Sequence, residues 1–435
     1  MGIRFARLWL LSAVSCLVAA GLSSEAARAE TRTAVDLTPE AVGKAIDAAE
    51  DGDTVQLPAG TAVWSKKVWN IGHQPKIKAI TIQGVGIDQT IITVDKSQSG
   101  NTSFNLEGVE SKPFRVTGIT LEGSLYPRDG SWGGLMSISG NCKNFRIDHC
   151  KFKNSDCMLS IQGDTYGLLD HCYFDGQISH GGNVQPIVFS GPGAPNYRKP
   201  LTLGTDQAMY FEDNEVYIAP TAGASGKRSG NNPWIAPHGG SRVVVRHNKI
   251  VNAELEIYRP GLNKQYGSQQ CEIYDNQFSV DDGTSQIIMC VGAGTAIVFN
   301  NTATGTSYWK PPSIMLRNER AWRDLPGFPK ADGKQPDDGN QIPAGQLGAG
   351  YPCFGQVGWA TNVDGKFSPS PCYAWNNTLN GKPLRMEVDH RVDANEAATV
   401  KEGREFFNEK PPEGCYNSIR KNTSGSIEDR PIPAA

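Results

Sequence analysis

The sequence predicts an all-β chain that folds as a right-handed parallel β-helix with an N-terminal capping helix. Three observations predict this fold. A short apolar frame recurs nine times, its copies are 22 to 34 residues apart in most of the series, and its central residue changes from apolar to Asn along the chain. A recurrence of this length is typical of a solenoid, in which each repeat buries its apolar face against the next.

The first 29 residues have the layout of an export signal. Arg4 and Arg7 precede an apolar run over residues 8–22, and a small-residue cleavage motif ends at Ala29. Cys16 offers an alternative cleavage point of the lipoprotein type. We therefore expect residues 1–29 to be removed and the mature protein to be secreted or periplasmic.

A short amphipathic helix is predicted directly before the repeats. Thr38 provides an N-cap and Pro39 stands at the first helical position. One face of this helix is apolar and comprises Val42, Ala45, Ile46 and Ala49. We expect the helix to cap the open end of the stack, where core and strand edges would otherwise be exposed.

The frame itself is clearest in "FRIDHCKF" at 145–152 and "GLLDHCYF" at 167–174, centred on Cys150 and Cys172. Apolar residues recur at positions −5, −3 and +2 from the centre. The −5/−3 alternation has the period of a strand, and the jump to +2 implies a bend. Each repeat has room for three short strands, which would stack on the next repeat at about 4.8 Å.

The residue at the centre of each frame has a structural role. A bend that points inward leaves backbone groups that need partners, and stacked Asn side chains can bond both the bend and one another. This ladder is expected to comprise Asn214, Asn248, Asn276, Asn301 and Asn377. In the earlier repeats the same position is expected to be filled by the apolar side chains of Val85, Ile119, Cys150 and Cys172.

We expect one β-helix domain over residues 30–385, with a long surface excursion at 302–370 and an irregular C-terminal tail at 386–435. The excursion is rich in aromatic residues. They would either stack on sugar rings or pin the loop to the scaffold. These residues are Tyr308, Trp309, Trp322, Phe328, Tyr351 and Trp359.

Composition excludes some classes of partner. The net charge is −3 and no basic tract is present, so nucleic acid is not an expected partner. No stretch beyond the signal approaches the roughly 18 apolar residues of a membrane span. A monomer is expected. Two disulfides are conceivable in an oxidising compartment, between Cys150 and Cys172 and between Cys353 and Cys372.

A polar strip is predicted on the outer face of the strands that precede the frames. These strands are expected at 135–139, 158–162, 186–190, 234–238, 254–259 and 286–290. By period-two alternation, the side chains expected on this outer face are Ser137, Ser139, Ser160, Gln162, Ser190, His238, Glu254, Glu256 and Tyr258. Arg259 follows at the end of the strand at 254–259. The concentration of His, Glu, Tyr and Arg on neighbouring repeats suggests a catalytic site, and a solvated surface is the alternative.

Two stretches of the sequence resemble pectate lyases. "FRIDHCKFKNSD" is similar to their I-D-H-C stretch followed by S-N-C-A-D, and "CEIYDNQF" is similar to their H-V-x-N-N segment after an R-x-P-x-x-R motif. The resemblance implies a calcium-dependent lyase that cleaves polygalacturonate by β-elimination, with Arg259 as the proton-abstracting arginine. The sequence departs from the pattern in that Arg259 directly precedes Pro260, and the family's calcium carboxylates fall on Cys157 and Ile161.

Three functions remain open from the residues. A polysaccharide lyase acting on a uronate polymer needs a base, an acid and a group that neutralises the carboxylate, and the candidates are Arg259, Tyr258, His238 and Glu256. Substrate contacts are expected from Glu254, Gln162, Ser190 and Trp234. A glycoside hydrolase could instead use Glu254 and Glu256, and a glycan-binding or adhesin module needs no catalysis. Ca²⁺ is a conceivable cofactor, without assigned ligands.

A second outward column is predicted at position −2 of the frame, comprising Asp148, Asp170, Glu212 and Arg246. Three carboxylates at strand spacing repel unless water or a cation separates their charges, so this column is expected to be either solvated or bridged by calcium. Metal binding by His149, Cys150, His171 and Cys172 is disfavoured, because the central cysteines should face the core.

Overall fold

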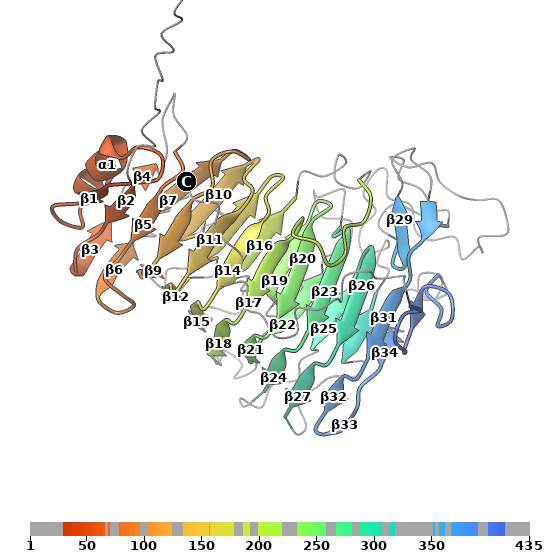
Figure 1. Ribbon diagram of the computed structural model, residues 1–435. Helices are drawn as coiled ribbons and strands as arrows, with labels where there is room; N and C mark the ends of the chain where they lie inside the picture. Colours follow the sequence, from red (N-terminus) through yellow and green to blue (C-terminus); the bar gives the residue numbers. More distant parts are fainter. Residues whose placement is uncertain are drawn as a thin grey trace, which may run out of the picture.

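The computed structural model describes residues 29–65, 68–69, 78–95, 103–123, 134–155, 157–177, 186–191, 199–219, 233–257, 267–280, 288–305, 313–317, 351–352, 356–361, 367–389 and 399–413. Their regular structure is nearly all β-strand, arranged in three long sheets that run side by side along the molecule (Figure 1). Among these residues, no helix has the length and apolarity that crossing a membrane requires.

Sheet A has 12 strands, paired in parallel throughout, in the order β1 (Thr31–Thr33), β2 (Thr54–Gln56), β5 (Thr81–Gln83), β8 (Arg115–Thr117), β11 (Phe145–Asp148), β14 (Gly167–Asp170), β17 (Met209–Glu212), β20 (Arg242–Arg246), β23 (Gln270–Tyr274), β26 (Thr295–Phe299), β31 (Cys372–Trp375) and β35 (Phe406–Phe407). This sheet contains the −5/−3 strands of the sequence frame.

Sheet B follows the bend in each repeat and has 11 strands: β3 (Gly60–Trp64), β6 (Thr90–Val94), β9 (Thr120–Gly123), β12 (Lys151–Lys153), β15 (Tyr173–Gln177), β18 (Glu215–Ala219), β21 (Lys249–Val251), β24 (Gln277–Ser279), β27 (Thr302–Thr304), β32 (Thr378–Leu379) and β33 (Lys382–Pro383). Its last pair, β32 and β33, is antiparallel, whereas the others are parallel.

Sheet C is parallel and has 10 strands: β4 (Val68–Trp69), β7 (Phe104–Gly108), β10 (Met136–Gly140), β13 (Leu159–Gln162), β16 (Ile187–Ser190), β19 (Pro233–His238), β22 (Glu254–Ile257), β25 (Met289–Val291), β28 (Ile314–Leu316) and β34 (Met386–Val388). Two further strands, β29 (Trp359–Thr361) and β30 (Phe367–Pro369), form a separate antiparallel pair. The chain visits sheets C, A and B in turn, which confirms the parallel β-helix.

The bend between sheets A and B has the same backbone conformation in successive coils. The residue before the frame centre has a positive φ, a region that Asn, Asp and His tolerate better than most side chains. Gly118 occupies this position in an early coil, with φ 69°. In later coils it is occupied by His149, His171, Asp213, His247, Asp275, Asn300 and Asn376. The positive φ at the bend therefore explains why a His precedes each central Cys in the two "DHC" stretches.

The predicted asparagine ladder is present and continuous. Asn248 Nδ2 donates to Asn276 Oδ1 (2.9 Å), and Asn276 Nδ2 donates to Asn301 Oδ1 (3.0 Å). The same oxygens also accept backbone N–H groups, and each Nδ2 reaches a main-chain carbonyl of the preceding coil, such as Val245 O from Asn276 (2.9 Å). Cys172 N donates to Asn214 Oδ1 (2.9 Å), so the cysteine lies directly above the first Asn.

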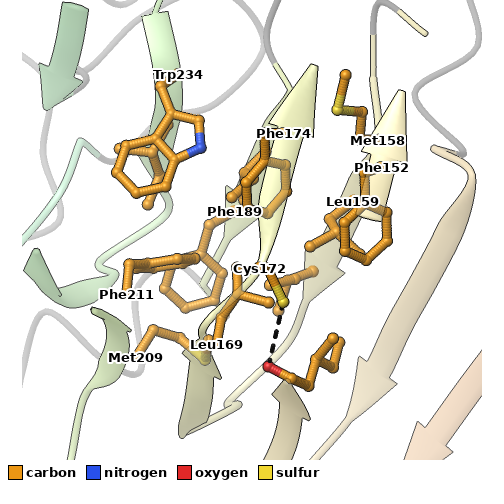
Figure 2. Close-up of a cluster of buried hydrophobic side chains, with 14 of the residues drawn as sticks. Phe152, Met158, Leu159, Leu169, Cys172, Phe174, Phe189, Met209, Phe211 and Trp234 are labelled. Atoms are coloured by element: carbon orange, nitrogen blue, oxygen red, sulfur yellow. Dashed lines mark hydrogen bonds between the residues drawn. The ribbon is translucent and has the colours of Figure 1, made fainter. Parts of the chain in front are cut away.

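The core is one continuous column of apolar side chains inside the three sheets. Equivalent residues of neighbouring coils stack, as Phe152 and Phe174 do with ring centroids 5.2 Å apart and planes 9° apart. Figure 2 shows the part of this core around Cys172, whose Sγ donates to Ile147 O (3.7 Å). Cys150 and Cys172 are buried free thiols, which does not match the suggested disulfide between them.

Three sequence expectations about the fold need correction. Val85 is 50 % exposed and does not fill an inward corner, because the chain turns through a longer segment between β5 and β6 than between β8 and β9. The tail is not irregular from 386 onward, since β34 extends sheet C and β35 extends sheet A. Within the excursion, β27 and β28 belong to the stack. Residues 1–28 and Cys353 lie outside the described residues.

The predicted helix α1 (Pro39–Ala48) lies at the N-terminal end of the stack (Figure 1), and Val42, Ala45 and Ile46 pack into the core. Thr38 is its N-cap, with Oγ1 accepting from Ala41 N (3.2 Å). We expect Thr38→Ala to lower the free energy of unfolding by about 1 kcal/mol, because one helix N–H loses its acceptor. Urea denaturation measures this, and an unchanged midpoint would contradict it.

Candidate functional site

The candidate site lies on the outer face of sheet C, where the predicted strands align in register. Ser137 pairs with Ser160 on the next coil. One row further along the strands, Gln162 pairs with Ser190, and Ser190 pairs with His238. The structure thus brings Gln162, Ser190 and His238 together as one row across three neighbouring coils.

Exposure changes along this row. Gln162 is exposed, Ser190 is half-buried and His238 is only 6 % exposed. The backbone fixes the end of the row, because Gly191 N donates to His238 O (3.0 Å) and Gly163 N donates to Ser190 O (2.9 Å). A ligand bound along this row would therefore contact the accessible amide of Gln162 at one end and the buried imidazole of His238 at the other.

The coil after that of His238 carries two buried carboxylates, Glu254 and Glu256. Leu255 and Ile257 of β22 point into the core, so Glu254 and Glu256 point to the outer face. Glu254 is 2 % exposed and Glu256 is 5 % exposed. A solvated surface is therefore excluded for these two side chains, and buried carboxylates on an outer face need a specific reason.

The strand neighbours of these glutamates are not charged. Glu254 pairs in register with Pro233 on one side, and Glu256 pairs with Cys290 on the other. Beyond Cys290, the same row continues through Met315 to the exposed Glu387. The described part of sheet C thus concentrates its buried acidic side chains on β22, next to the coil of His238.

Trp234 does not lie on the outer face, so its predicted contact with a sugar ring is wrong. Its side chain is fully buried in the core, edge-on to Phe174 (6.0 Å) and to Phe211 (6.2 Å), as Figure 2 shows. The register of β19 shifts between Pro233 and Ile235. This bulge lets Trp234 and Ile235 both point inward, so the aromatic ring is not available to a sugar.

Tyr258 and Arg259 lie outside the described residues, directly after Ile257 at the end of β22. Their predicted roles stay predictions. Cys157 and Ile161, which the pectate lyase resemblance aligned with calcium carboxylates, are buried and carry no carboxylate. Among the residues that the structure describes, no cluster of three or more His, Cys, Asp or Glu could hold a metal ion.

The second predicted column is neither solvated nor arranged for calcium. Asp148 is fully buried and forms a two-pronged ion pair with Arg115, at 2.6 Å for each contact. Arg146 forms the same kind of pair with Asp170, at 2.9 and 2.7 Å. Burial alone would raise the pKa of Asp148, but hydrogen bonds from Arg115 and His149 outweigh it and hold that pKa below its usual value.

Sequence reasoning missed these arginines, although their signal was present. Arg146 lies two residues before Asp148 on its strand of sheet A, and Arg115 lies two residues before Thr117, the register partner of Asp148. Both arginines therefore share the outer face of the column. Arg246, which the predicted column already included, pairs with Glu212 of the preceding coil at 2.5 Å. The column is therefore a ladder of ion pairs that stabilises the outer face of sheet A.

His149 and His171 stack beside this ladder with ring centroids 5.1 Å apart and planes 4° apart. Their Nδ1 atoms lie 2.9 and 2.8 Å from Asp148 and Asp170. The neighbouring Cys150 and Cys172 point into the core, on the opposite side of the sheet. The four side chains therefore do not converge on one point.

Two aromatics of the excursion are pinned to the scaffold. Tyr351 is buried and donates a hydrogen bond to Glu405, and Trp359 Nε1 donates to Tyr351 Oη (3.0 Å). Arg404 completes the cluster with Nε 2.6 Å from Glu405 Oε1. For these two residues the structure favours the pinning role. Tyr308, Trp309, Trp322 and Phe328 lie outside the described residues.

No protein-family model and no curated protein matches the sequence. Among solved structures, the chain is similar to a mannuronic acid specific family 6 polysaccharide lyase from human gut microbiota, with TM-score 0.42, 15 % identity and coverage of 82 % of this chain and 78 % of that one. The Azotobacter vinelandii mannuronan C-5 epimerase AlgE6 A-module gives TM-score 0.36 and 13 % identity, over 80 % of this chain and 84 % of that one.

A third similar structure is the catalytic domain of a GH87 α-1,3-glucanase, with TM-score 0.28 and 10 % identity over 82 % of this chain and 67 % of that one. At these identities and scores, the assignment of fold depends on the strand pairing of the chain itself. That pairing, three sheets visited in rotation by successive coils, makes the chain a parallel β-helix protein.

Proposed function

We propose that this protein is an exported polysaccharide lyase that cleaves a uronate-containing polymer by β-elimination on the outer face of sheet C. The observation that supports it best is the burial of Glu254 and Glu256 on an outer sheet face, one coil from His238. Buried ionisable groups that cluster outside the core are more typical of functional sites than of bare surface.

The chemistry assigns a role to each candidate. Elimination removes a proton α to the uronate carboxylate, breaks the bond to the leaving oxygen and forms a carbon–carbon double bond. Arg259 or Tyr258 would take the proton, and His238 or Glu256 would deliver one to the leaving oxygen. Glu254, Gln162 and Ser190 would bind hydroxyl groups of the sugar. Ca²⁺ could neutralise the substrate carboxylate, and a chelator tests whether it is required.

A hydrolase on the same scaffold is the second candidate, and one observation favours it. Glu254 and Glu256 are two residues apart on one strand and share a face, so their Cα atoms are roughly 6.6 Å apart. Glycosidases use two carboxyl groups that are roughly 5–5.5 Å apart for retention and roughly 6.5–9.5 Å apart for inversion, and two carboxylates on one strand face are compatible with either. The product distinguishes the two reactions.

The test is a panel of polymers that includes polygalacturonate, alginate and a neutral glucan, each incubated with and without a chelator. We expect new ultraviolet absorbance from the unsaturated product on at least one uronate polymer. New reducing ends without that absorbance would replace the lyase by the hydrolase. Retention on an immobilised glycan without any product would leave only the binding module.

A further inference from the structure

We propose that residues 199–207 form a strap that is docked across the outer face of sheet A in acid and released in alkali, with Glu272 as the controlling group. The strap lies between β16 and β17 in the sequence, yet it contacts strands two and three coils further along. This proposal concerns sheet A and is independent of the reaction proposed for sheet C.

Side chains of β23 hold the backbone of the strap. Thr202 N donates to Gln270 Oε1 (2.8 Å), and Gly204 N donates to Glu272 Oε1 (2.6 Å). Between these two anchors the strap turns, with Thr205 N donating to Thr202 O (3.1 Å) and Gly204 at φ 66°. A positive φ at this turn suits Gly, and it directs the Gly204 amide toward the carboxyl group.

Groups that keep one charge state near neutral pH hold the rest of the strap. Lys199 Nζ lies 3.0 Å from Asp164 Oδ2. Burial alone would raise the pKa of Asp164, but hydrogen bonds from Lys143 and Lys199 outweigh it and hold that pKa below its usual value. Arg242 donates to Thr202 Oγ1 (2.8 Å) and to Pro200 O (2.9 Å), and Gln269 Nε2 donates to Lys199 O (2.8 Å). None of these three bonds depends on a group that titrates near neutral pH. Among the side chains described as binding the strap, only Glu272 can change its charge between mildly acid and mildly alkaline solution.

The strap also covers apolar surface. Leu203 packs against a cluster on the outer face of sheet A formed by Ile297, Phe299 and Tyr373. On a β-helix this face would ordinarily meet water, so its apolar residues gain from being covered. The strap is therefore bound by an apolar contact as well as by hydrogen bonds. Its release would break these hydrogen bonds and expose the apolar cluster to water.

Glu272 has surroundings that disfavour its charge while the strap is docked. It is 4 % exposed, and its register neighbours on both sides are apolar, Val244 on β20 and Ile297 on β26. Arg246 is directed elsewhere, 2.5 Å from Glu212 and 2.9 Å from the Tyr274 hydroxyl. The charged or titratable groups of the surrounding elements are Lys199, Asp206, Tyr210, Glu212, Arg242, Arg246 and Tyr274.

Burial raises the pKa of Glu272 to about 7, against the Gly204 hydrogen bond and the charge of Arg246, which both favour the ionised form. The ordinary pKa of a Glu side chain is 4.5. Because the docked form holds its proton more tightly, docking is most favourable below the lower pKa and weakens as pH rises through the higher one. When the strap is released, the carboxyl group of Glu272 is in contact with water, and burial no longer opposes its ionisation.

Hydrogen–deuterium exchange of the full chain tests this at about pH 5.5 and 8.5, on either side of the expected transition. After correction for the intrinsic rate of amide exchange, we expect protection of the strap to fall by about tenfold or more at the higher pH. Peptides from β20 and β23 serve as the internal reference and should keep their protection at both values.

Glu272→Gln is the decisive variant, because an amide still accepts the Gly204 hydrogen bond and cannot ionise. Its strap should stay protected at both pH values. Glu215→Gln, which removes an exposed carboxylate of sheet B, should respond like the wild type. Equal protection of the wild-type strap at the two pH values would overturn the proposal, and so would loss of strap protection in Glu272→Gln at the higher pH.

Discussion

The Glu256→Gln variant is expected to lose about two to four orders of magnitude in kcat/KM on whichever polymer the wild type cleaves. Gln keeps the size of the buried side chain and removes its ability to give or take a proton. Since Glu256 is 5 % exposed and its register neighbour is Cys290, water cannot readily substitute for the carboxyl group. Initial rates over a range of polymer concentrations measure the effect.

Glu387→Gln is the matched control. Glu387 belongs to the same row of sheet C as Glu256 by strand register, but it is exposed and lies three coils away. Its replacement should change kcat/KM by less than about twofold, because exposed positions away from a site rarely matter. A Glu256→Gln variant that folds normally and keeps wild-type kcat/KM would remove Glu256 from the site.

The Asn276→Leu variant is expected to lower the free energy of unfolding by about 3 to 5 kcal/mol, since several buried groups lose partners at once. Asn276 Oδ1 accepts both the backbone N–H and the Nδ2 of Asn248, and Asn276 Nδ2 donates to Val245 O and Tyr274 O. Leu fills a similar volume, so the loss reports hydrogen bonds and not a cavity. Urea denaturation followed by circular dichroism measures it.

Gln277→Leu provides the comparison, because Gln277 is the next residue and its side chain is exposed on β24. It should change stability by less than about 0.5 kcal/mol. If both variants unfolded at the wild-type midpoint, the asparagine column would contribute no net stability and would serve only to set the shape of the bend.

The scaffold could be predicted from sequence because its rules are local and repeated. Cys172 and Asn276 occupy equivalent corners, as the ladder of hydrogen bonds between them shows. Period-two alternation also placed Ser190, His238 and Glu256 correctly on the outer face of sheet C. Each of these inferences needs only the strand period and the recurrence of the bend.

The features that could not be predicted from the sequence depend on contacts that the period of a strand does not specify. Trp234 turned inward because one bulge changed the alternation locally. The acidic column was neutralised by Arg115 and Arg146, which a search along one column overlooks. Burial of Glu254 depends on what covers the outer face of the sheet, and strand alternation says only on which side a residue lies.

The most direct test of the account is a crystal structure of Glu256→Gln with an oligouronate from the polymer that the wild type cleaves. We predict that the sugar lies on the outer face of sheet C, over Gln162 and Ser190, with a glycosidic oxygen within hydrogen-bond distance of His238 or residue 256. An oligouronate bound on sheet A or B, with sheet C unoccupied, would contradict it.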